Sequence, residues 1–232
     1  MPMEHRLYDD YGAFKNYETP ELKPKHIRQF DRDFWAPAFC TADSSILEVG
    51  CGTGRFLRYL KAKGVGKFTG IDQDSGLSKV IPDEVSDNFH NLPVEEFIRT
   101  HTQPGSFDRI VLFDVLEHFS PDEGLGLLNE LSPLLSPGGL FVLKLPNMSS
   151  PWGAQHQFGD LTHKAAYTPT SLRQLSIAAG LECVSCYPQQ TGSPVRRFLD
   201  PLVHGVLSKC LMSPPEIWSA NFLAILRRPE TP

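Results

Sequence analysis

The stretch Glu48-Val49-Gly50-Cys51-Gly52-Thr53-Gly54 follows a short apolar run at residues 45–49 and precedes a segment with helical spacing at residues 55–63. Alternate glycines allow a tight turn and let a ligand approach the backbone closely. The N-terminus of the following helix directs free N–H groups and partial positive charge toward that ligand. The stretch therefore predicts a ligand-binding turn after a first strand.

Apolar strands and amphipathic helices alternate beyond this turn. Further strands are predicted at residues 67–72, 87–91, 107–113, 140–145, 181–187 and 222–226. Helices are predicted at residues 26–39, 55–63, 121–135 and 170–179. Continuously apolar strands separated by helices are typical of a parallel sheet covered on both faces. The predicted fold class is therefore a doubly wound α/β fold, which binds ligands beyond the carboxyl ends of its strands.

Three features indicate which ligand the turn binds. Arg55 occupies the last position of the dinucleotide fingerprint Gly-x-Gly-x-x-Gly counted from Gly50, where a glycine is required. Glu48 is poorly placed for a pyrophosphate but well placed for a cationic group. Asp72, at the end of the second predicted strand, can accept hydrogen bonds from both hydroxyls of a ribose. These features describe a nucleoside with a positively charged tail and no phosphates, which is S-adenosylmethionine (SAM).

Residues 44–147 resemble the class I SAM-dependent methyltransferase superfamily. Besides the glycine turn, the motifs that carry the resemblance are Gly70-Ile71-Asp72, Phe107-Asp108, Asp114-Val115-Leu116-Glu117-His118, Leu135-Ser136-Pro137-Gly138-Gly139 and Leu145-Pro146-Asn147. The resemblance implies a Rossmann-like sheet of seven strands in the order 3-2-1-4-5-7-6, with the last strand antiparallel. It also implies an enzyme that transfers a methyl group from SAM to a small-molecule acceptor.

The resemblance assigns residues to the donor. The glycine turn would hold the methionine part of SAM through Glu48, Gly50, Cys51, Gly52 and Gly54, and Asp72 would hold the ribose. Asn91 is the candidate for the adenine amino group, with Glu95 or Glu96 as alternatives. The backbone at Phe113 and Asp114 would face the methionine amino group.

A hydroxyl acceptor must lose its proton, a task that suits histidine. The segment Gly159-Asp160-Leu161-Thr162-His163 resembles one branch of bacterial methyltransferases acting on sugars, lipids and other secondary metabolites. Asp160 is therefore predicted to orient His163 as general base, unless the two residues only fix a loop. His118 is a second candidate and is interpreted first as structural or close to SAM.

The run Asp114-x-x-Glu117-His118 also resembles a set that binds a divalent metal in ubiquinone-biosynthesis O-methyltransferases. Two carboxylates and an imidazole could hold Mg²⁺. We assign no residue as a metal ligand, and Mg²⁺ stays an open alternative. Methylation at nitrogen or carbon, and a non-catalytic SAM-binding regulatory subunit, are the alternatives to methylation at oxygen of a glycan, sugar or lipid-linked metabolite.

The predicted methyltransferase domain spans residues 44–232, and residues 1–43 are predicted to form a helical lead-in or lid. Its tyrosines, Tyr8, Tyr11 and Tyr17, could close over the donor. Residues 194–219 form an insertion with an apolar stripe at helical spacing, expected to face the core, with a lid or a dimer face as alternatives. Arg196 and Arg197 in this insertion are either solvated charges or contacts for an acidic acceptor.

The composition favours a globular protein and argues against a dedicated nucleic-acid binder. The 232 residues are 41% hydrophobic, as in globular proteins, and a net charge of −5 gives no general attraction to nucleic acids. No secretory signal or membrane-spanning segment is recognisable. Five cysteines without a disulfide spacing favour the reducing cytoplasm. The sequence gives no indication of oligomeric state.

Overall fold

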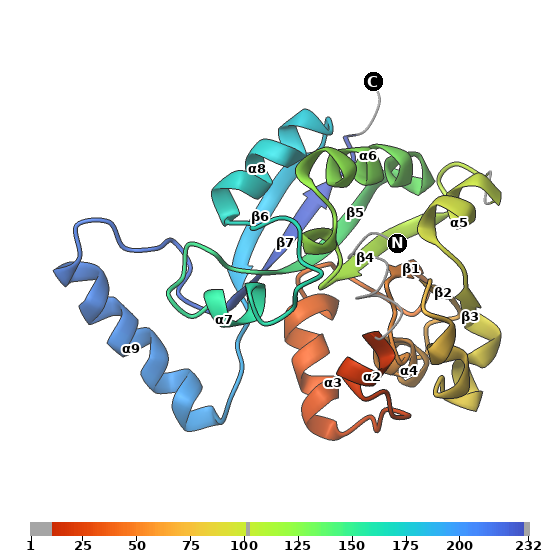
Figure 1. Ribbon diagram of the computed structural model, residues 1–232, viewed down its shortest axis with the longest axis horizontal. Helices are drawn as coiled ribbons and strands as arrows, with labels where there is room; N and C mark the ends of the chain where they lie inside the picture. The colour runs from red at the N-terminus through yellow and green to blue at the C-terminus, as the bar shows by residue number, and fades with distance from the viewer. Residues whose placement is uncertain (1–10, 101–102, 230–232) are drawn as a thin grey trace.

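The computed structural model describes residues 11–100 and 103–229 of the chain. A sheet of seven strands runs through it in the order β3-β2-β1-β4-β5-β7-β6 (Figure 1). The strands are β1 (Ser45–Val49), β2 (Lys67–Asp72), β3 (Phe89–Asn91), β4 (Phe107–Phe113), β5 (Leu135–Pro146), β6 (Glu182–Pro188) and β7 (Asn221–Arg227). β7 is antiparallel to β5 and β6, and the other pairs are parallel. The predicted fold class and strand order are confirmed.

Helices cover both faces of the sheet (Figure 1). One face carries α5 (Val94–Thr100), α6 (Pro121–Leu131) and α8 (Pro169–Ala178). The other face carries α4 (Arg55–Ala62) and α3 (Pro24–Phe30), which continues into the π-helical turn η1 (Asp31–Trp35). Successive side chains of a strand point to opposite faces, so Ile110 and Leu112 of β4 belong to one core cluster and Val111 to the other.

Several boundaries differ from those predicted. α6 ends at Leu131, and the turn η5 (Ser132–Leu134) leads into β5 at Leu135, five residues before the predicted start at 140. The strand passes through Gly138 and Gly139, and its pairing with β4 shifts register there, between Phe107 and Arg109. The short elements that the sequence did not predict are α2 (Tyr11–Lys15), η2 (Ser75–Lys79), η3 (Asp83–Asn88), α5, η4 (Leu116–His118) and α7 (Ala154–Gln157).

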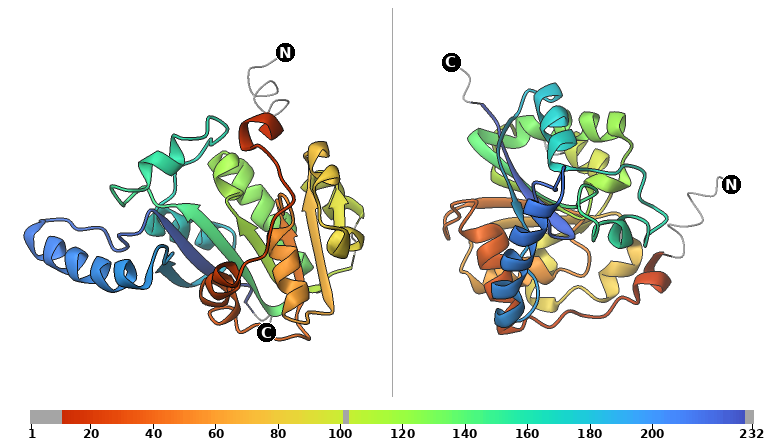
Figure 2. Two further views of the ribbon diagram at one scale, coloured as in Figure 1. Left: turned by 90° about the horizontal axis from the view of Figure 1, so that it is seen from below. Right: turned by 90° about the vertical axis from the view of Figure 1, so that its left-hand side faces the viewer.

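The insertion forms α9 (Pro194–Cys210), a helix that projects beyond β6 at one end of the molecule (Figures 1 and 2). The structure describes all of its residues, and none of them is buried. The expectation that its apolar stripe faces the core is therefore wrong. Among the helices of the described residues, none is long and apolar enough to cross a bilayer.

Candidate active site

The glycine turn joins β1 to α4 at the carboxyl ends of the strands. The amides of Gly50 and Cys51 donate to the carbonyl of Ile71 at 2.9 and 3.0 Å, which ties the turn to β2. Gly50 has φ +69°, and a Cβ there would lie 2.6 Å from Cγ2 of Val115. Only glycine meets both conditions, so the close approach of the turn to the end of β4 depends on it.

Asp72 braces this turn from the end of β2. Its Oδ2 accepts from the Gly52 amide at 2.9 Å, and its Oδ1 accepts from the Asp74 amide at 3.0 Å. Asn91 donates through Nδ2 to the carbonyls of Asp72 and Asp74, both at 2.9 Å. Since both amide hydrogens are used, Oδ1 is the atom with which Asn91 can accept a bond from an adenine amino group. The predicted donor residues thus lie together at one edge of the sheet.

Glu48 lies beneath the turn and is 4% exposed. Among the described residues its Oε2 has no hydrogen-bond partner. Burial, reinforced by the charge of Asp72, raises the pKa of this carboxyl well above its usual value. A buried carboxyl with an unmade bond can take a cationic partner, and the ammonium group of SAM would be one.

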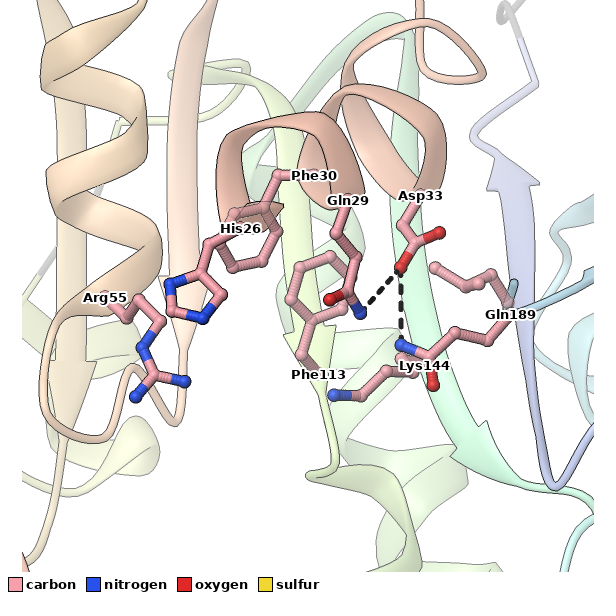
Figure 3. A pocket seen from close by; sticks show the side chains of 9 residues that line it. His26, Gln29, Phe30, Asp33, Arg55, Phe113, Lys144 and Gln189 are labelled. Carbon is pink, nitrogen blue, oxygen red and sulfur yellow. Dashed lines mark hydrogen bonds between the residues drawn. The ribbon is translucent and has the colours of Figure 1, made fainter. Parts of the chain in front are cut away.

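β4 ends in a strained turn. Asp114 has φ +58°, its amide donates to the carbonyl of Lys144 at 3.0 Å, and its Oδ2 pairs with Lys144 Nζ at 2.5 Å. The Phe113 ring packs on Phe56 of α4, with ring centroids 5.3 Å apart. Phe113 and Lys144 also line a cavity of about 140 Å³ beside α3, together with His26 and Arg55 (Figure 3).

A larger cavity, about 300 Å³, opens beside Asp114 on the acceptor side. Its lining comes from α2, from η4, from the segment between β5 and α8, and from the ends of β4, β5 and β7 nearby. It consists of Tyr11, Lys15, Asp114, Glu117, His118, Pro146, Gln155, His156, Gly159, Asp160, His163 and Asn221. This volume is at the lower end of the range for small-molecule sites. The structure therefore brings the predicted residues His118, Asp160 and His163 into one cavity.

Asp160 accepts four hydrogen bonds or ion pairs at this cavity. Its Oδ1 accepts from the Thr162 amide at 3.0 Å and from Thr162 Oγ1 at 2.5 Å. Its Oδ2 accepts from the Tyr11 hydroxyl at 2.8 Å and pairs with Lys15 Nζ at 2.9 Å. Burial alone would raise the pKa of Asp160, but the donors on Thr162, Lys15 and Tyr11 outweigh it and hold the pKa below its usual value. Asp160 is therefore an ionised acceptor.

The carboxylate connects to His118 rather than directly to His163. Thr162 Oγ1 lies 2.9 Å from His118 Nδ1, whereas His163 Nδ1 lies 2.9 Å from the carbonyl of Gln157. The two imidazole rings are in edge contact, with centroids 4.6 Å apart. Burial, together with the neighbouring charge of His163, lowers the pKa of His118 to about 4. Thr162 was not singled out from the sequence, because its hydroxyl is one of many and its partner lies 44 residues away.

Glu117 is fully buried between these histidines and the core, and burial raises its pKa well above the usual value. Glu117, His118 and His163 each offer one ligand atom, and these atoms lie within 4.8 Å of one another. Two imidazoles and one carboxylate suit a transition metal, whereas Mg²⁺ takes mainly oxygen ligands. Asp114 pairs with Lys144 instead. Among the described residues the clustered ligand atoms are therefore not those of the set that the resemblance implies for Mg²⁺, because His163 takes the place of Asp114.

The N-terminal segment reaches both halves of the site. Tyr11 contacts Asp160 on the acceptor side, and the Tyr17 hydroxyl donates to Asp74 Oδ2 at 3.0 Å on the donor side (Figure 2, left, red). Tyr8 lies outside the described residues. Arg196 and Arg197 lie on α9, away from the residues that line either described cavity.

Comparisons with known proteins show the family to which the chain belongs. Residues 19–186 match the model of a family described as a methyltransferase domain. A ubiquinone biosynthesis O-methyltransferase of Xanthomonas campestris pv. campestris (strain B100) is 30% identical over 131 residues, 54% of this chain and 53% of that protein. One from Chromobacterium violaceum is 26% identical over 77% of this chain and 79% of that protein. The chain spans about half the length of the first of these relatives.

Solved structures share the fold. A SAM-dependent methyltransferase from Archaeoglobus fulgidus has a TM-score of 0.66 at 18% identity, over 97% of this chain and 99% of that chain. The 1,6-didemethyltoxoflavin-N1-methyltransferase of Burkholderia thailandensis, with S-adenosylhomocysteine bound, has a TM-score of 0.62 at 16% identity, over 98% of this chain and 87% of that chain.

Proposed function

Because the chain belongs to the methyltransferase-domain family and takes SAM as its methyl donor, we propose that it methylates an oxygen atom of a small-molecule acceptor with His118 as general base. The observation that carries the proposal is the hydrogen-bonded series Asp160–Thr162–His118 at the acceptor cavity. SAM, when bound, supplies an activated methyl group on sulfur. The chain then has to align the acceptor and remove its proton.

The series fixes the tautomer of His118. The ionised Asp160 can only accept, and a threonine hydroxyl has one hydrogen, which goes to Asp160 Oδ1. Thr162 Oγ1 must therefore accept from His118, which places the imidazole hydrogen on Nδ1. Nε2 then carries the lone pair and can take the proton of an acceptor hydroxyl. The same logic orients the histidine of the Ser-His-Asp triad, although here a threonine stands between acid and base.

His163 is the second candidate for the base. Its Nδ1 lies at the Gln157 carbonyl, and only a protonated Nδ1 can donate to that oxygen, so its Nε2 carries the lone pair of the neutral ring. We favour His118 because its Nδ1 is linked through Thr162 to the ionised carboxylate of Asp160.

We assign the enzyme to the cytoplasm, where its five free cysteines would stay reduced. The acceptor class we propose is a glycan, a sugar or a lipid-linked metabolite with a free hydroxyl.

The test uses methyl-labelled SAM and a panel of acceptors: a methyl glycoside, a polyprenyl-linked sugar, a catechol and the amine analogue of each. Label on the oxygen of a hydroxyl acceptor supports the proposal. Label only on nitrogen or carbon contradicts it. Tight binding of S-adenosylhomocysteine without transfer to any member of the panel would favour a regulatory subunit.

A further inference from the structure

α9 turns its apolar side to the solvent. Its exposed apolar side chains are Val195, Phe198, Leu199, Leu202, Val203 and Val206, with Phe198 71% and Val206 64% exposed. Leu211 and Met212 extend the exposed apolar surface past the end of the helix. A contiguous apolar surface of this kind on a globular protein marks a site of interaction.

The side of α9 opposite its apolar side chains contacts Trp218, in the segment that follows the helix. The His204 ring stacks on Trp218 with centroids 5.0 Å apart, and Trp218 Nε1 donates to Ser208 Oγ at 3.0 Å. Pro201 and Gly205 are poor helix formers inside the helix. A helix that lacks both buried apolar contacts and favourable propensity needs a partner on its apolar side.

We propose that α9 docks into the surface of an anionic phospholipid bilayer, with its apolar side among the acyl chains. The charges of α9 complement such a surface. The helix carries Arg196, Arg197 and Lys209 against the single acid Asp200, in a chain whose net charge is −5. Asp200 pairs with Arg196 at 3.8 Å. Interfacial helices have this composition, with long basic side chains that extend to the headgroups.

The width of the apolar sector favours a flat surface over a second helix. At about 100° per residue, Val203 and Phe198 bound an apolar sector of about 140°. A seam between two paired helices is narrower. Because α9 projects beyond β6, at the end of the molecule opposite β3, a bilayer can meet it without the rest of the sheet intervening (Figures 1 and 2).

The experiment is flotation of the full chain with vesicles of phosphatidylglycerol and phosphatidylcholine, and with vesicles of phosphatidylcholine alone. We expect the wild type to float with the anionic vesicles and to partition at least tenfold less onto the neutral ones. The double variant Leu202→Ser/Val206→Ser should lose at least tenfold of the anionic binding. Ile177→Ser, at a position on α8 that is 76% exposed, is the matched control and should bind as the wild type does.

Calorimetry with S-adenosylhomocysteine verifies that each variant is folded. Vesicle binding needs neither donor nor acceptor, so its outcome is independent of the methyl-transfer proposal. Failure of the wild type to float with anionic vesicles overturns the inference, as does full binding by the double variant. A wild-type dimer that the double variant converts to a monomer, without vesicle binding, would assign the apolar side of α9 to a second copy of the chain.

Discussion

The donor side of the site is built from backbone and short side chains at the ends of neighbouring strands, whereas the acceptor side is built from side chains that converge from distant segments. Gly50, Gly52 and Asp72 are joined through the β1–β2 pairing. His118, Thr162 and Tyr11 meet only because the segment after β5 and the N-terminal segment fold over the cavity. A donor site made by the sheet stays constant, while an acceptor site made by loops can change its specificity without changing the fold.

Replacing His118 with Ala gives the largest expected effect and tests the acceptor side alone. Loss of a general base costs about 10²–10⁴-fold in turnover. We expect kcat to fall by that factor with an acceptor that supports turnover, while calorimetry shows unchanged affinity for S-adenosylhomocysteine. His163→Ala should lower kcat by less than about tenfold with the same acceptor. If His163→Ala is instead the more damaging variant, Asp160 supports the other imidazole.

Replacing Asp72 with Ala tests the donor side. Its carboxylate braces Gly52 and is the group that we propose holds the ribose, so the loss of charge-assisted bonds should weaken S-adenosylhomocysteine binding by about 1–3 kcal/mol. Calorimetry measures this directly. Asp87→Ala removes the same charge from an exposed position in η3 and should leave the affinity unchanged. Equal affinities for the two variants would contradict the assignment of Asp72 to the ribose.

The donor side could be predicted from the sequence because each of its parts is local. The alternate glycines, the acid before them and the acid at the end of β2 each stand beside an apolar strand, and parallel strands bring their carboxyl ends to one edge. The bracing of the turn by Asp72 was not predictable. Its bond to the Gly52 amide depends on the conformation of the turn, which the residue types do not specify.

The acceptor side was predicted only as a set of residues. The spacing of Asp160 and His163 suggested a direct pair, but Asp160 reaches His118 through Thr162 instead. Which imidazole a carboxylate supports is decided by a contact between segments far apart in the chain. The prediction that the apolar side of α9 faces the core was wrong for a related reason. Helical periodicity shows that one side is apolar but not on which side the protein lies.

Thr162→Val removes the hydroxyl between acid and base and tests whether the series, rather than the cavity alone, prepares His118. Loss of one hydrogen bond of this kind costs about 0.5–1.5 kcal/mol, so kcat/KM should fall by about two- to tenfold. Thr162→Ser keeps the hydroxyl and should restore the rate. Nitrogen NMR of labelled histidine should show the hydrogen of His118 on Nδ1 in the wild type and a mixed population in the valine variant. A wild-type imidazole with its hydrogen on Nε2 contradicts the series.

The smallest expected effect on activity is that of lowering the pH. Burial and the charges of His163 and Lys15 lower the pKa of His118 to about 4, against the opposing charge of Asp160. The base is therefore still deprotonated at pH 5.5, where an imidazole of ordinary pKa would be only about one-tenth deprotonated. We expect kcat/KM to change by less than about twofold between pH 7 and 5.5 on this account.

The lowered pKa of His118 also makes the free energy of unfolding depend on pH. The unfolded His118 takes up a proton as the pH falls below about 6.5, and the folded one does so only near 4, so the free energy of unfolding declines between these values. Thermal melts at each pH separate this loss from a loss of catalysis. An acid limb near pH 6.5 in a protein that is still folded would show that the catalytic base is an exposed imidazole. That result would shift the role from His118 to a group outside the Asp160–Thr162 series, while the donor side would be unaffected.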